Sequence, residues 1–165
     1  MRRRHLLGLF AAITACTQSP APDELNPATK AAVRDSVLAA AGRYDRALTS
    51  LDSAQIAGFF APIPEFELVV GRMRLGRSSV LQWAGGLRAT HRSVSGGLAL
   101  DSVNVVVLSP RAALVIASIT NVWTDTAGVV ATDRGTGSTT WALVGHDWRI
   151  VAAHLVWDAP ELQRP

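Results

Sequence analysis

The segment from Thr132 to Trp157 restricts the fold more than any other part of this 165-residue chain. It is rich in β-branched and aromatic residues, and Gly145-His146-Asp147 interrupts it. Such residues favour extended strands, whereas glycine and aspartate favour a tight turn. We therefore predict a hairpin with strands at 132–144 and 147–156. Both faces of the second strand are largely apolar, which predicts a central position in the sheet, with the even positions from 148 to 156 on one face.

This hairpin resembles the end of SnoaL-like domains of the nuclear transport factor two-like superfamily. Members often end with a glycine-containing strand, a threonine and an aromatic residue, then a tight turn and a Trp-Arg-Ile-Val strand with a histidine near its end. The matching residues here are Gly135, Thr139, Thr140, Trp141, Trp148, Arg149, Ile150, Val151 and His154. The resemblance extends over about residues 27–157. It implies an α+β fold in which a cone-like, curved antiparallel (mixed) sheet packs on N-terminal helices around an interior pocket.

The segment before residue 91 predicts three helices and a strand. A helix should begin at Asn26-Pro27, because asparagine caps helices well and proline fits the first helical position. Asp52 with Gln55 resembles a capping box and predicts a second, short helix. Residues 65–70 alternate as a strand does. A third helix should follow Gly76, and the pair Gly85-Gly86 should end or kink it.

Three longer strands are predicted after the third helix. In the first of them, the apolar positions switch from even to odd numbers at Asp101-Ser102, which we interpret as a β-bulge. In the second, the odd positions from Ala113 to Trp123 should share one face. The third strand is the first half of the hairpin described above.

Residues 1–15 are predicted to be a signal peptide. Three arginines precede an apolar run that is too short to span a hydrocarbon core of about 30 Å. The sequence Ile13-Thr14-Ala15-Cys16 resembles a bacterial lipobox, which implies cleavage before Cys16 and lipid on its sulfur. A plain secretory peptide with an incidental cysteine is the alternative. Residues 16–26 would form the lipidated cysteine and a flexible tether, 27–158 the domain and 159–165 a tail.

These features predict an exported protein that is anchored by lipid in the bacterial cell envelope. Whether export uses the general or the twin-arginine route stays open, because Arg3-Arg4-His5-Leu6-Leu7 is faintly similar to a twin-arginine signal. The net charge of +3 comes from Arg2, Arg3 and Arg4, and the rest of the chain has 13 basic and 13 acidic residues. A nucleic-acid-binding face would need a basic cluster, and only Arg72, Arg74 and Arg77 approach one, so we predict no nucleic-acid partner.

No motif in the sequence assigns a reaction. The four histidines, at positions 5, 91, 146 and 154, lack metal-ligand spacing, so we predict neither a metal nor a cofactor. His154 and Glu67 are the candidate catalytic pair, as a titratable group near neutral pH and a carboxylate base. The alternatives are a core histidine and a solvated glutamate. Candidate residues for a ligand pocket, or else for core packing, are Tyr44, Trp83, Trp123 and Trp141.

Two functions are compatible with these features. The first is a non-catalytic envelope domain that binds a small apolar ligand or another protein, with a homodimer through the outer sheet face implied by the resemblance. The alternative is an isomerase, cyclase or dehydratase that uses a pocket His154 and Glu67. The enzyme would require both side chains to point into one cavity.

Overall fold

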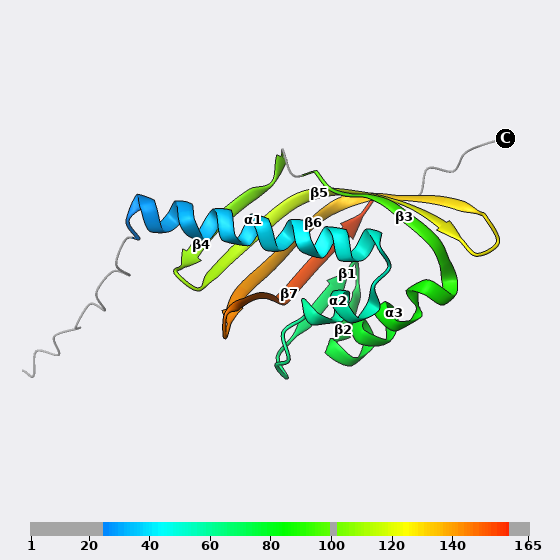
Figure 1. Cartoon of the computed structure of the whole chain (residues 1–165), viewed down its shortest axis with the longest axis horizontal. Helices are drawn as coiled ribbons and strands as arrows, with labels where there is room; N and C mark the ends of the chain where they lie inside the picture. The colour runs from blue at the N-terminus through cyan, green and yellow to red at the C-terminus, as the bar shows by residue number, and fades with distance from the viewer. Residues whose placement is uncertain (1–24, 100–101, 159–165) are drawn as a thin grey trace, which may run out of the picture.

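The computed structural model describes residues 25–99 and 102–158 (Figure 1). The predicted signal peptide, Cys16 and the tail at 159–165 lie outside the described residues. Asp101, which belongs to the predicted bulge, also lies outside the described residues. None of the described helices is long and apolar enough to cross a membrane.

The first helix, α1 (Pro27–Thr49), confirms the prediction made from its capping signals. The Asn26 side chain accepts a hydrogen bond of 2.8 Å from the Thr29 N–H, and proline occupies the first turn. The buried residues recur at helical spacing, so one stripe of the helix faces the interior. These buried residues are Val33, Val37, Ala40, Ala41, Gly42, Ala47 and Leu48.

Two further helices follow. In α2 (Ser53–Gly58) the Asp52 carboxylate accepts from the Gln55 N–H at 3.0 Å, as the capping box predicts. Helix α3 (Arg77–Thr90) continues through Gly85-Gly86, so the prediction that this pair could end the helix is wrong. Ala84 and Leu87 flank the two glycines and are both buried in the core, and this packing outweighs the low helix propensity of glycine.

The remaining elements form a sheet of seven strands. They are β1 (Glu67–Val70), β2 (Met73–Gly76), β3 (His91–Leu98), β4 (Asn104–Ser109), β5 (Ala112–Asp125), β6 (Val130–Val144) and β7 (Asp147–Trp157). The strand order is β2-β1-β7-β6-β5-β3, and β4 also pairs with β5. The β1–β7 pair is parallel and the other pairs are antiparallel. The predicted mixed α+β sheet, with β7 away from the edges, is therefore confirmed.

Strands β3 and β4 replace the single bent strand that the sequence predicted. Strand β3 pairs with residues 119–125 of β5, whereas β4 pairs with residues 112–116. Both lie along the same edge of β5, so the chain follows this edge in two short strands separated by a break. The switch in apolar positions near residue 101 marked that break.

The predicted facing of β7 is wrong in its second half. Thr140 pairs with Ala152 but Trp141 pairs with Ile150, so Val151 is an extra residue in the ladder. Such a bulge reverses the facing of the residues that follow it. Trp148, Ile150 and Ala153 are therefore buried, whereas His154 and Val156 are exposed.

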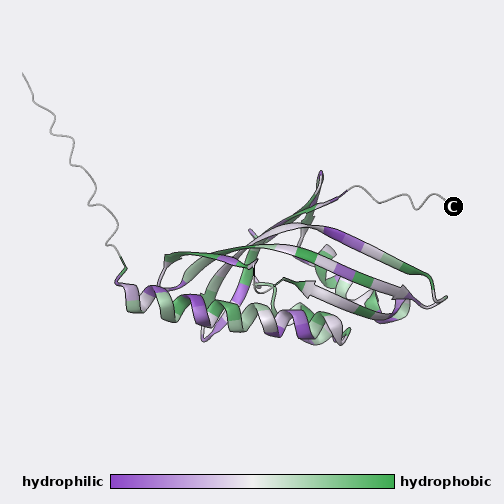
Figure 2. Ribbon diagram, turned by 90° about the horizontal axis from the view of Figure 1, so that it is seen from above, coloured by the Kyte–Doolittle hydropathy of each residue, from purple (hydrophilic) through white to green (hydrophobic). Residues whose placement is uncertain are grey.

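The helices cover one face of the sheet, as Figures 1 and 2 show for α1. We call this side the helix face. On β5 it consists of the odd positions from Ala113 to Trp123, as predicted, and Ala113, Val115 and Ala117 contribute to the main core. The even positions of β5 lie on the opposite side, which we call the open face.

Candidate functional site

Aromatic side chains occupy the part of the interior between α1, α2 and β6. Tyr44 meets Phe59 edge to face with ring centroids 5.5 Å apart, and Phe59 meets Trp141 in the same way at 6.3 Å. The Trp141 indole N–H donates to the Thr139 hydroxyl at 2.8 Å. This cluster fills the space with rings in geometries that aromatic pairs prefer, so it belongs to the packed core.

Polar groups gather farther along the helix face, where β5 pairs with β3. Asn121 is 5% exposed, and its Oδ1 is buried without a hydrogen-bond partner. Two residues on, and on the same face, the Trp123 indole N–H is also buried and unpaired. One atom accepts and the other donates, so this stretch of β5 presents both kinds of hydrogen-bonding group to the interior.

A carboxyl group from α1 lies beside this stretch. The Leu98 N–H donates to Asp45 Oδ1 at 3.2 Å, and the carboxyl group rests against the backbone of Gly97. Leu98 pairs with Ile119, so Asn121 is its diagonal neighbour on β5, at a spacing of roughly 7–8 Å. A glycine is required at position 97, because its φ of +127° is unfavourable for other residues and a side chain would overlap the carboxyl group.

Burial changes the acidity of two neighbouring groups on α1. It raises the pKa of Asp45 above its ordinary value, although the Leu98 N–H and the Arg46 guanidinium partly oppose this. Burial and, second, the Asp45 carboxylate raise the pKa of the Tyr44 phenol to about 12. Asp45 therefore holds a proton more tightly than a solvated aspartate, which suits a group that takes up and returns protons.

The raised pKa of Tyr44 can be measured directly, because the chain contains one tyrosine. We expect the ultraviolet absorbance of phenolate to appear near pH 12 and not near pH 10. Since the unfolded chain ionises first, stability should be unaffected below pH 10 and should fall between pH 10 and about pH 12. Asp45→Asn should lower the midpoint, because it removes the second cause of the shift. A midpoint near 10 in protein whose circular dichroism is still native would contradict the burial of the phenol.

A solvent-open hollow of about 520 Å³ lies at the end of the sheet where β5 turns into β6. Its lining comes from the α1–α2 turn, the end of α3, the start of β3 and the β5–β6 turn: Ser50, Leu51, Arg88, His91, Arg92 and Thr126. The His91 ring also contacts the Trp123 ring, with centroids 4.9 Å apart. The hollow therefore adjoins the polar stretch of β5 through this ring pair.

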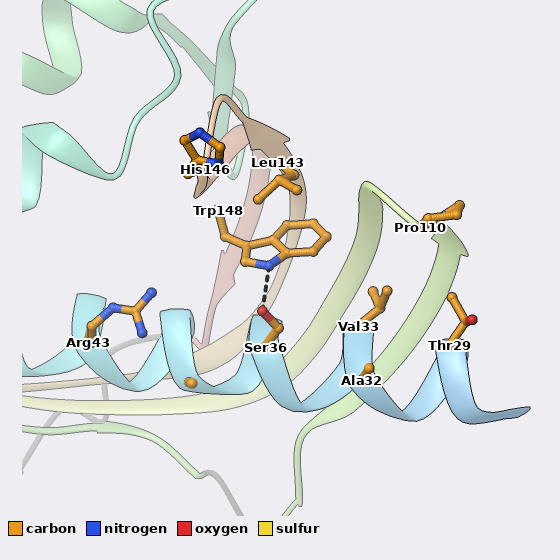
Figure 3. A pocket seen from close by; sticks show the side chains of 10 residues that line it. Thr29, Ala32, Val33, Ser36, Arg43, Pro110, Leu143, His146 and Trp148 are labelled. Atoms are coloured by element: carbon orange, nitrogen blue, oxygen red, sulfur yellow. Dashed lines mark hydrogen bonds between the residues drawn. The ribbon is translucent and has the colours of Figure 1, made fainter.

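A second hollow, of about 410 Å³, is a groove along α1 from Thr29 to Arg43 (Figure 3). The β4–β5 turn at Pro110 and the β6–β7 turn at His146 form its other wall. The Trp148 indole N–H donates to the Ser36 hydroxyl across the groove at 2.9 Å. Because that hydrogen bond links β7 to α1, Ser36 and Trp148 stabilise the packing of the helix on the sheet.

The structure does not place the predicted catalytic pair in a cavity. His154 is exposed on the open face, beyond the Val151 bulge. Glu67 lies on the same face of the neighbouring strand and forms a two-point ion pair with Arg74, at 2.6 and 2.8 Å. The Arg74 hydrogen bonds lower the Glu67 pKa, which makes it a weaker base.

The four predicted pocket residues do not share a hollow. Trp141 and Tyr44 belong to the aromatic cluster, Trp123 is part of the polar stretch of β5, and Trp83 is 42% exposed on α3. None of the four lines either hollow described above.

Sequence reasoning did not single out Asp45, Asn121 or His91 as site residues. Asp45 was not among the predicted site residues, yet it is four residues after the buried Ala41 and borders the buried stripe of α1. Asn121 was correctly placed on one face of β5 with the other odd positions, and a lone amide among apolar residues was the available signal. Within residues 25–99 and 102–158, no group of three or more His, Cys, Asp or Glu residues is arranged to hold a metal ion.

No protein-family model matches the sequence, and no curated protein matches it significantly. Solved structures do match over most of the chain. An NTF2-like superfamily protein from Salmonella enterica serovar Typhimurium superposes with a TM-score of 0.68 at 19% identity, covering 82% of this chain and 99% of that one. This chain has the NTF2-like fold.

Other NTF2-like structures carry names that refer to reactions. A proposed scytalone dehydratase from Novosphingobium aromaticivorans matches with a TM-score of 0.71 at 15% identity, covering 84% of this chain and 98% of that one. A hexachlorocyclohexane dehydrochlorinase, type 2, matches with a TM-score of 0.66 at 9% identity, covering 84% and 95%. At such identities the likeness establishes the fold, as the resemblance of the hairpin predicted.

Proposed function

We propose that this protein binds a small, mostly apolar molecule on the helix face of its sheet, between Asp45, Asn121 and Trp123. The observation that carries the proposal is the pair of buried, unpaired polar atoms on β5. A buried polar group without a partner costs about 1–3 kcal/mol, and a ligand that supplies partners recovers that cost. The ligand would donate a hydrogen bond to Asn121 Oδ1 and accept one from the Trp123 indole.

Native mass spectrometry of the full-length protein purified from its host tests this proposal. We expect a small molecule to stay bound to the wild type and to be lost from Asn121→Leu, which removes the acceptor while nearly preserving the volume. Because the orphaned oxygen goes with it, Asn121→Leu should unfold at the same or a higher temperature. Equal retention by both proteins, or an empty wild type, would contradict the proposal.

Proton transfer is a second candidate function, and Asp45 is the observation that favours it. Dehydration and dehydrochlorination, the reactions in the names of two structural neighbours, each remove a proton together with a leaving group. Asp45, with its raised pKa, would take the proton, and the Trp123 indole N–H would stabilise negative charge that develops on an oxygen. This assignment moves the proposed base from Glu67 to Asp45.

Asp45→Asn separates catalysis from binding. The variant should keep the bound molecule but lose its conversion, because an amide cannot accept the proton. Since burial raises the Asp45 pKa, folding favours the protonated form, and wild-type stability falls as pH rises through the pKa values of the unfolded and then the folded state. Asp45→Asn should therefore gain stability relative to the wild type as the pH rises above 3.8, the ordinary pKa of an aspartate. Unchanged turnover in this variant would reject the catalytic role.

We also propose that the protein is exported and anchored to the cell envelope by lipid on Cys16. The support is the Ile13-Thr14-Ala15-Cys16 sequence after a basic and apolar leader. Cells grown with a palmitate analogue should label the wild type but not Cys16→Ser, and the variant should leave the membrane fraction. Several acyl chains anchor far more firmly than one, so the wild type should resist extraction by high salt. Unlabelled wild type that retains residues 1–15 would reject the anchor.

A further inference from the structure

Three groups that can carry positive charge converge on the hollow between the α1–α2 turn and the β5–β6 turn. Arg88 comes from the last turn of α3, and His91 and Arg92 come from the start of β3. The hydroxyl-bearing Ser50 and Thr126 complete the polar lining, and no carboxylate belongs to it. We call Arg88, His91 and Arg92 the cationic cluster.

Backbone carbonyls hold both arginines in place. Arg88 donates to the carbonyls of Leu51 and Ser50, at 2.9 and 3.2 Å, and Arg92 donates to the Thr126 carbonyl at 3.2 Å. A carbonyl fixes the position of a guanidinium but does not neutralise it, and each guanidinium has five N–H donors. Both arginines therefore keep full charge and spare donors in a fixed geometry.

The acids near the cluster are engaged elsewhere. Hydrogen bonds from Gln55 and, to a lesser extent, the Arg88 charge lower the pKa of Asp52. Its carboxylate caps α2 by accepting from the Gln55 backbone N–H at 3.0 Å and from the Gln55 side-chain amide at 2.8 Å. Asp125, which pairs with His91 in the ladder, accepts from the Val129 N–H at 2.8 Å. Neither carboxylate forms a salt bridge with Arg88 or Arg92 among the described residues, so no ion pair occupies the donors of the cluster.

The hydrogen bonds of His91 direct one ring nitrogen away from the α3 terminus. The Thr90 hydroxyl lies 2.8 Å from His91 Nδ1 and within hydrogen-bond distance of the Gly86 and Leu87 carbonyls, so it engages Nδ1 in either tautomer of the ring. With Nδ1 engaged, Nε2 is the nitrogen that can donate to an anion when the ring is protonated.

The backbone beneath Arg88 is also unusual. Leu51 has a φ of +53°, in the left-handed region that residues other than glycine rarely adopt. Its carbonyl is the nearer acceptor for Arg88. Backbone strain of this kind persists where the surroundings fix it, and it often accompanies ligand sites.

We propose that the cationic cluster is a binding site for an oxyanion of the phosphate class. Two guanidinium groups and an imidazole supply the charge and the directed N–H donors that a phosphate dianion requires. The cationic cluster shares no residue with the proposed site at Asp45, Asn121 and Trp123, although the His91 ring contacts the Trp123 ring.

Nuclear magnetic resonance of the histidine rings tests the site with inorganic phosphate on the full-length protein. We expect the His91 ring resonances to shift in a saturable way as phosphate is added. The His146 and His154 resonances, from exposed rings elsewhere on the molecule, should stay in place and act as internal controls. No shift at His91, or equal shifts of the His91, His146 and His154 rings, would overturn the proposal.

Substitutions separate a site from general screening by charge. Arg92→Gln should weaken phosphate binding at least about ten-fold, and Arg92→Lys should recover part of the loss. Arg72→Gln removes the same charge from the exposed β1–β2 turn and should leave binding unchanged. An equal effect of Arg72→Gln and Arg92→Gln would show a diffuse charge effect and reject the site.

The source of the phosphate group is resolved by two further probes, glycerol 3-phosphate and vesicles that contain phosphatidylglycerol. Binding of the soluble phosphates alone assigns a soluble metabolite. Sedimentation with vesicles that Arg92→Gln abolishes, in protein lacking lipid on Cys16, assigns a lipid headgroup. Failure of all three probes rejects the oxyanion site but leaves binding on the helix face intact.

Discussion

Trp141→Ala should lower the free energy of unfolding by about 3–5 kcal/mol, the usual cost of removing a large aromatic side chain from a core. Trp141 is 1% exposed and is the largest fully buried side chain. It packs edge to face on Phe59, and its indole N–H donates to Thr139. Alanine would leave a cavity between α2 and β6 that the rigid sheet cannot close.

A second tryptophan supplies the control for this measurement. Trp83 is 42% exposed on α3, so Trp83→Ala should cost less than about 1 kcal/mol. Urea denaturation of both variants compares them in one experiment. If Trp141→Ala does not fold, Trp141→Phe keeps a ring and should give an intermediate loss. Similar stabilities for the Trp83 and Trp141 variants would contradict the assignment of Trp141 to the core.

Gly97→Ala should displace the Asp45 carboxyl group and lower stability by about 1–3 kcal/mol, the usual cost of a residue held in an unfavourable backbone region. The φ of Gly97 is +127°, and a Cβ atom there would overlap the carboxyl oxygens of Asp45. The side chain must then leave the Leu98 N–H, which loses its acceptor. The variant should therefore bind the helix-face ligand poorly as well as unfold more readily.

Gly85→Ala is the matched control for this substitution. Gly85 lies in α3 with open space where a Cβ would be, so alanine should stabilise the protein by about 0.5–1 kcal/mol. Thermal unfolding gives both values, and the amide resonance of Leu98 reports the loss of its hydrogen bond. A Gly97→Ala protein with an unchanged Leu98 resonance would show that the carboxyl group does not rest there.

The elements that could be predicted are those set by local chemistry. Asn26 and Asp52 cap the helices that they were expected to cap, because a cap depends on a few adjacent residues. The alternation along β5 correctly placed Asn121 and Trp123 on the same face as Ala113, because no bulge interrupts the pairing of β5 with β6.

The predictions were wrong where the position of a side chain depends on a bulge or on a distant part of the chain. The extra Val151 reverses the second half of β7 and puts His154 outside, and nothing in the apolar sequence around it marks the bulge. Asp45 was overlooked because its role depends on Gly97 and Leu98, more than fifty residues away. Spatial neighbours of that kind are not visible in the periodicity of a single helix.

The indole N–H resonances of the five tryptophans test the central claim, that the unpaired polar groups on β5 bind a small molecule. Trp123→Phe and Trp83→Phe identify the two signals that matter, and a small-molecule extract of the host supplies the ligand. We predict that the Trp123 signal shifts as its N–H gains an acceptor, while the exposed Trp83 signal does not move. A Trp123 signal that stays fixed, or that moves only together with Trp83, would contradict the claim.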